Sequence, residues 1–253
     1  MFRTDYLRTV VFLAQNAIAG QYRDSFLGVL WMLIVPLMQV VIFAVVMPLI
    51  ARFPTTRYPL FLVAMYPLWS FIAGSLIGST RSLVGQAEIL KRCVVSRTVF
   101  PVADVLRQFY TFTVSLTVMM AVASALLAAW NPLLALLPIF LAPVLVSVLA
   151  LAVGLSFLAP FVKDLTEFLA VGMNVMFWLT PVVYPITAVP ERWQRWFVLN
   201  PFYVLMRPIY LLAYANAVPG WGDVLRLLAV TAGCVAVGYG LYRACRRDFV
   251  YYL

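Results

Sequence analysis

Six long apolar stretches dominate the chain, and short polar segments separate them. Each has close to the roughly 20 residues that an α-helix needs to cross the hydrocarbon core of a bilayer. They cover residues 26–50, 59–81, 103–128, 132–160, 168–186 and 224–242. Pro138 and Pro143 predict a kink near the outer end of the fourth stretch. The pattern therefore predicts an all-α integral membrane protein with six transmembrane helices.

The N-terminal segment has its apolar residues on one side of a helix. Phe2, Tyr6, Val10, Leu13 and Ala17 follow one another at intervals of four, four, three and four residues. This sustained stripe favours an amphipathic helix in the membrane interface over a disordered leader. We assign residues 1–25 to this interface helix.

Residues 190–221, before the last stretch, are apolar but interrupted by charges and prolines. Asn200 followed by Pro201 is typical of a helix N-cap and first helical residue, so one short helix ends there and another begins. Each piece is too short to cross a bilayer, which predicts two short re-entrant or interfacial helices.

Composition excludes an ordinary soluble domain, because 65% of the residues are hydrophobic and only 11% are charged. The net charge of +9 fits contact with anionic membrane lipids better than nucleic acid binding. With the N-terminus inside, twelve Lys and Arg residues fall on inner segments and six on outer ones. We therefore expect a single transmembrane domain, residues 1–253, with both termini in the cytoplasm.

The chain lacks the residues of an enzyme or an ion-coupled transporter. No Asp or Glu lies in the middle of a predicted span, there is no His, and the three Cys residues form no close pair. A phosphate-binding G-x-x-x-x-G-K-[ST] loop is absent, since the only lysines are Lys91 and Lys163. We therefore predict that the chain is not an enzyme and has no cofactor or metal of its own. If transport is uphill, another polypeptide must supply the energy.

The inner loop at residues 83–100 has a helix-forming composition and a polar cluster. Glu88 and Arg92 are four residues apart and so share a helix face. A short exposed helix in this loop could insert into a cleft on a soluble ATPase. The alternative is that residues 83–100 form an ordinary solvated loop. The candidate coupling residues are Gln86, Glu88, Lys91, Arg92 and Arg97.

Aromatic residues form a second candidate constellation. Flat rings can slide along the C–H faces of sugars without holding one unit tightly, although aromatic belts also mark membrane interfaces. The candidate channel aromatics are Trp69, Phe71, Tyr110, Phe112, Phe177, Trp178 and Tyr184.

The stretch from Gly20 to Leu37 leads from the polar N-terminal segment into the first apolar one. Tyr22 and Arg23 lie at this transition, and Arg23 can hold an anionic headgroup there. The alternative is a flank whose arginine only follows the positive-inside tendency. Arg8, Tyr22 and Arg23 are the candidates for contact with such an anionic group.

The run Tyr22-Arg23-x-Ser25-x-Leu27-Gly28-x-x-Trp31-x-x-x-x-Pro36-Leu37 closely resembles the start of the first transmembrane helix in permease subunits of ABC-type polysaccharide exporters. Thr180-Pro181-Val182-Val183-Tyr184-Pro185 is similar to the family's Ser-Pro-x-x-Tyr-Pro element, and Lys163-Asp164-Leu165 to its Arg-Asp-Leu. Asn200-Pro201 with Arg207 resembles its Asn-Pro element between the short outer helices, which makes Asn200 and Arg207 outer-gate candidates. Arg97 to Pro101 is similar to the end of its coupling helix, although Val94-Val95-Ser96 replaces a lysine-rich run.

The resemblance implies a permease that exports an undecaprenyl-linked O-antigen, capsule or teichoic-acid chain across the bacterial inner membrane. With such a cargo, Arg8, Tyr22 and Arg23 become the candidates for admitting the lipid pyrophosphate. The resemblance also implies a homodimer with two copies of a cytoplasmic ATPase subunit, which would hold the ATP and Mg. A symmetric dimer fits the few polar residues, since one chain cannot enclose a wide polar path. The alternatives are a drug or lipid exporter of the same superfamily, or a non-transporting membrane scaffold.

Overall fold

The computed structural model describes residues 2–22, 26–51, 58–86, 96–126 and 131–247. Its long helices are α1 (Phe2–Tyr22), α2 (Trp31–Ala51), α3 (Tyr58–Val84), α5 (Val99–Leu126), α6 (Leu137–Leu158), α7 (Leu165–Leu179) and α10 (Trp221–Cys245). Two shorter ones, α8 (Glu191–Leu199) and α9 (Pro201–Ala213), precede α10, and the 3-10 turns are η1 (Gly28–Leu30), η2 (Pro132–Leu136) and η3 (Ile186–Ala188). The prediction of an all-helical membrane protein is confirmed for these parts of the chain.

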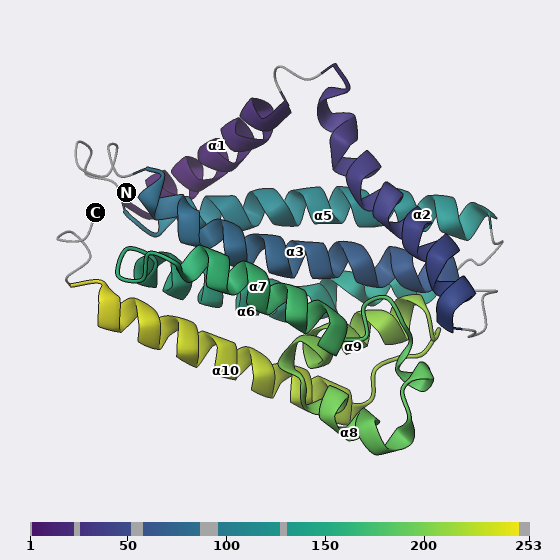
Figure 1. Ribbon diagram of the computed structural model, residues 1–253. Coiled ribbons are helices and arrows are strands. Elements are labelled where there is room, and N and C mark those ends of the chain that lie inside the picture. Colours follow the sequence, from purple (N-terminus) through teal and green to yellow (C-terminus); the bar gives the residue numbers. More distant parts are fainter. Residues whose placement is uncertain (1, 23–25, 52–57, 87–95, 127–130, 248–253) are drawn as a thin grey trace.

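Helix α3 is the centre of the bundle. It packs against α2, α5, α6, α7 and α9, and most of its side chains are buried (Figure 1). Helix α10 lies along α6, and the C-terminal end of α10 is at the same end of the bundle as the start of α5 (Figure 1). Helices α8 and α9 lie beside the other end of α10, away from the starts of α1 and α5 (Figure 1).

Five helical segments are long and apolar enough to cross a membrane, by length and composition, in the described part of the chain. They are Gly28–Ile50, Tyr58–Val84, Val99–Leu126, Pro132–Leu158 and Trp221–Cys245. Helices α8 and α9 pass the same test only together, and they are bent by 102° at Asn200. Five of the six predicted spans therefore correspond to long helices.

The predicted fifth span, residues 168–186, differs from the structure. Helix α7 has 15 residues, fewer than the roughly 20 that a straight span requires. It ends because Pro181 restricts Thr180 to an extended backbone (φ −113°, ψ 134°). Residues 180–185 then run without helix to η3.

The predicted N-terminal helix is present as α1, and part of its apolar stripe packs on protein. Val10 and Ala14 are buried against Val99 and Ala103 of α5, and Tyr6 contributes to the same cluster. A second set of apolar residues on α1, Leu7, Val11 and Phe12, is exposed. Helices α1 and α2 form an inverted V above α5 (Figure 1).

The predicted break at Asn200 is confirmed in detail. The Asn200 side-chain oxygen accepts a hydrogen bond from the backbone N–H of Phe202 at 2.9 Å, and Pro201 is the first residue of α9. In the fourth span, the helix changes from 3-10 to α next to Pro138, and Pro143 lies inside α6.

Candidate functional site

A groove of about 400 Å³ lies between α2, α3 and α7. Aromatic rings from the three helices form its wall. Phe43 of α2 lies 5.8 Å from Tyr66 and 6.0 Å from Phe177 of α7, measured between ring centroids. Trp69 of α3 lies 5.9 Å from Phe177. These tilted rings pack against one another and give the groove an apolar aromatic wall.

The groove also has polar lining residues. Gln39 comes from the middle of α2, Asn174 from α7, and Tyr66 and Ser70 from α3. Aromatic faces together with amide and hydroxyl groups suit a ligand that has both C–H faces and hydroxyl groups, such as a sugar.

The sequence analysis missed Gln39 and Asn174. Each is the only amide side chain of its helix, in the two helices α2 and α7 that are otherwise largely apolar. A polar residue within a span usually faces protein or a water-filled cavity, so this isolation was the signal that could have found them.

The predicted aromatic constellation divides into separate groups. Trp69 and Phe177 line the groove. Phe71 and Phe112 stack at 5.4 Å in a second place, between α3 and α5. Tyr110 and Trp178 are half exposed and lie on neither wall, while Tyr184 donates a hydrogen bond to the carbonyl of Trp178 at 2.5 Å.

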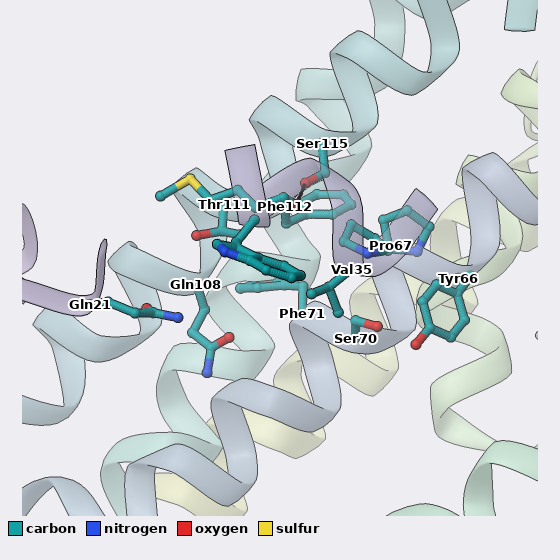
Figure 2. Close-up of a pocket in the computed structure, with 13 residues that line it drawn as sticks. Gln21, Val35, Tyr66, Pro67, Ser70, Phe71, Gln108, Thr111, Phe112 and Ser115 are labelled. Carbon is teal, nitrogen blue, oxygen red and sulfur yellow. Dashed lines mark hydrogen bonds between the residues drawn. The ribbon is translucent and has the colours of Figure 1, made fainter. Parts of the chain in front are cut away.

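The second place is a cavity of about 450 Å³ beneath the start of α2 (Figure 2). Phe71, Phe112 and Trp31 give it apolar walls, and Gln108 and Thr111 point polar groups toward it. Ser115 donates a hydrogen bond to the Met32 carbonyl at 2.8 Å, which holds α2 against α5. This cavity separates the beginning of α2 from the α3–α5 pair.

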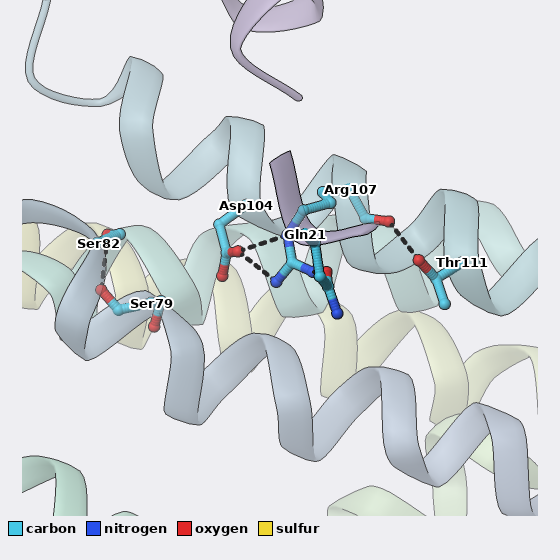
Figure 3. A network of polar contacts seen from close by, with 6 residues as sticks. All are labelled: Gln21, Ser79, Ser82, Asp104, Arg107 and Thr111. Carbon is cyan, nitrogen blue, oxygen red and sulfur yellow. Dashed lines mark hydrogen bonds and ion pairs between the residues drawn. The ribbon is translucent and has the colours of Figure 1, made fainter. Parts of the chain in front are cut away.

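A charged network in the N-terminal part of α5 secures the end of α1 (Figure 3). Arg107 donates two hydrogen bonds to one oxygen of Asp104, at 3.1 and 2.8 Å, and a third to the side chain of Gln21 at 2.7 Å. The other Asp104 oxygen is buried against Gly78, where an added Cβ would lie 2.7 Å away. Gly74 likewise makes room for Gln108, so these two glycines, four residues apart on α3, admit polar side chains from α5.

The candidates for lipid-pyrophosphate admission and for coupling are only partly described. Arg8 is exposed on α1, Gln86 is exposed just after α3, and Arg97 is partly buried just before α5. The Tyr22 side chain and residues Arg23, Glu88, Lys91 and Arg92 lie outside the described part of the chain.

Both outer-gate candidates are engaged within the protomer. Asn200 donates hydrogen bonds to the Leu179 carbonyl at 3.1 Å and to Thr180 Oγ1 at 2.8 Å, so it ties the end of α7 to α9. Arg207 of α9 pairs with Asp223 of α10 at 2.6 Å and donates to the Tyr203 hydroxyl at 2.9 Å.

Known proteins match this chain over most of its length. Residues 8–212 match the family model described as ABC-2 type transporter. The O-antigen export system permease protein RfbA of Klebsiella pneumoniae is 27% identical over 198 residues, covering 76% of this chain and 74% of that protein. The protein of the same name from Myxococcus xanthus is 23% identical over 248 residues, covering 96% and 95%. The matched segment runs from α1 through most of α9, and the chain belongs to the ABC-2 type transporter family, a family of membrane-embedded transport proteins.

Proposed function

We propose that the chain is the membrane subunit of an ATP-driven exporter that moves an undecaprenyl-pyrophosphate-linked polysaccharide across the bacterial inner membrane. The observation that carries this proposal is the groove between α2, α3 and α7, where Trp69 and Phe177 lie beside Gln39 and Asn174. Its combination of rings and amides suits a sugar chain, and the curated relatives are named as O-antigen export permeases.

The groove is open on one side, so one protomer supplies half of a path. Helix α2 leaves many apolar side chains exposed, including Val41, Val45 and Leu49. A second copy facing the first would cover part of this surface and close the groove into a conduit, with the symmetry that homodimers usually have. Lipid would cover the rest.

Two ATPase subunits on the cytoplasmic side would drive the cycle. Residues 83–100 would act as the coupling helix, with Gln86 and Arg97 at its two described ends. Closure of the ATPase pair around ATP would rotate the two permease halves as rigid bodies and open the conduit.

The carrier's pyrophosphate would enter near Arg8, Tyr22 and Arg23. Arginine suits this role because its planar guanidinium donates paired hydrogen bonds to phosphate oxygens. Arg8 is exposed on α1, on the helix that leads to the start of α2.

The test is deletion of the gene, followed by analysis of the surface glycan and of undecaprenyl-linked glycan retained in the cytosol. Export of a lipid-linked glycan predicts loss of the surface polymer and accumulation of the linked form, with restoration by the wild-type gene. Complementation by Trp69→Ala together with Phe177→Ala should restore less surface polymer than Tyr110→Ala, whose ring lies outside the groove. An unchanged surface glycan with a changed sensitivity to drugs would instead identify a small-molecule exporter.

A further inference from the structure

The three helices that wall the groove carry almost no charge. Helix α2 has no charged residue, α3 has only Arg81, and α7 has only Glu167. These two form an ion pair at 3.4 Å at one end of the helices, and both side chains are more than two thirds exposed. The residues that line the groove therefore include no charged side chain.

The polar groups that the groove does offer are the two amides. Within the described residues, neither Gln39 nor Asn174 forms a hydrogen bond through its side chain. An amide placed between apolar helices commonly bonds a neighbouring helix, since an unpaired amide in an apolar setting is costly. Here the amides of two different helices instead line the same open groove.

An amide side chain and a sugar hydroxyl are matched in chemistry, because each can both donate and accept a hydrogen bond. A phosphate or carboxylate needs a cation or several strong donors, and the groove walls hold no cation. Passing a charge in every repeat along such walls is unfavourable, because desolvation energies grow as the surroundings become less polar, whereas the carrier's pyrophosphate brings its charge only once per polymer.

Resting on the proposed function, we infer that the transported polymer is an uncharged glycan. Gln39 and Asn174 bond its hydroxyl groups in turn, while its C–H faces pass over Phe43 and Phe177, whose rings are partly exposed in the groove. Glycans that carry a phosphate or carboxylate in each repeat are poor substrates for this groove.

The experiment uses cells that lack their own exporter and express the chain with its ATPase partner. The cells make either a neutral hexose homopolymer or the same polymer with a glucuronate in every repeat, both on undecaprenyl pyrophosphate. We expect the neutral polymer at the surface and the anionic one reduced by about tenfold or more, the factor that a modest difference in free energy produces. Equal export of both would overturn the inference and leave the proposed function intact. If neither polymer reaches the surface, the proposed function itself fails.

Variants of the amides test the contacts directly. Asn174→Leu and Gln39→Leu should each lower neutral export by about fivefold, the effect of losing one hydrogen bond. Gln39→Lys, which adds a cation, should raise export of the anionic polymer relative to the neutral one. Val175→Leu is the matched control, because Val175 is half exposed on α7 and does not line the groove.

The amount of dimer in detergent is measured for every variant. A sugar contact predicts that the leucine variants lower export while the dimer stays unchanged. A fall in dimer that parallels the fall in export would show that the amides hold helices together, and would overturn their assignment as glycan contacts. A Gln39→Lys variant that leaves the ratio of the two polymers unchanged would also count against the inference.

Discussion

Asn200 joins the start of α9 to the end of α7 through one side-chain amide. Its oxygen caps α9, and its nitrogen donates to Leu179 and Thr180 at the end of α7. Asn200→Ala removes all three hydrogen bonds, and we expect a loss of about 1–2 kcal/mol of stability from the cap and its partners. Thermal unfolding in detergent would show this as a lower midpoint temperature.

Asn200→Asp is the matched variant, because a carboxylate keeps the cap acceptor but loses both donated bonds. Its midpoint should lie between those of the wild type and Asn200→Ala. If all three proteins unfold at the same temperature, the side chain does not stabilise this end of the bundle, and a role in gating alone would remain.

Arg107 is a second residue whose side chain joins two helices. It connects Gln21, at the end of α1, to Asp104 of α5. Arg107→Ala should free the last turn of α1, which hydrogen–deuterium exchange of residues 16–22 would detect as faster exchange. Gln21→Glu should slow that exchange relative to the wild type, because it gives Arg107 a second carboxylate. Identical exchange of residues 16–22 in the two variants would show that the contact between Arg107 and Gln21 does not hold the end of α1.

At the scale of elements, α6 and α10 approach each other closely at a pair of glycines. A Cβ on Gly238 would overlap the carbonyl of Ala150, and Gly154 faces Gly238 in turn. Gly238→Leu should push these helices apart and destabilise the protein by about 1–3 kcal/mol, the usual cost of overpacking. Gly233→Ala and Gly240→Ala are controls on the same helix, because an added Cβ there meets no atom within 4 Å.

The two control substitutions also have an expected effect on stability. Alanine favours a helix over glycine by about 1 kcal/mol, so Gly233→Ala and Gly240→Ala should leave the midpoint unchanged or raise it. Chemical or thermal unfolding of the three variants in one detergent provides the comparison. A Gly238→Leu protein as stable as the controls would show that α6 and α10 do not need this approach.

The sequence predicts a helix boundary correctly where a local residue pattern specifies it. Asn200-Pro201 marks a cap and a helix start, and the structure has the break there. The end of the fifth span was missed, because Pro181 ends α7 while the apolar composition continues to Ile186. Hydropathy reports the length and hydrophobicity of an apolar stretch, whereas the backbone restriction on the residue before proline decides where this helix ends.

The faces of the spanning helices could not be predicted in the same way. Apart from Gln39, helix α2 is apolar all round, so no polar stripe indicates which residues meet α3. Helix packing in lipid depends on shape and hydrogen bonds more than on hydrophobicity, so the sequence did not separate Trp69 and Phe177 in the groove from the half-exposed Tyr110 and Trp178. The lone amides Gln39 and Asn174 were the available signal for the facing sides.

For the whole molecule, the distribution of ionisable groups limits how transport can be powered. The charged residues described within α3, α5 and α9 form ion pairs, Arg81 with Glu167, Arg107 with Asp104 and Arg207 with Asp223. The middle of each predicted span has no Asp or Glu that could take up and release a proton or sodium ion across the membrane.

We therefore expect export to require ATP hydrolysis on a separate subunit. Liposomes that hold the chain alone should not move a lipid-linked glycan, either with no gradient or with an imposed proton or sodium gradient. Adding the ATPase partner and ATP should start transport, and an ATPase variant that binds but cannot hydrolyse ATP should not sustain it. Transport driven by an ion gradient in the absence of the ATPase would contradict this, because the ion would need a binding site that the apolar spans do not provide.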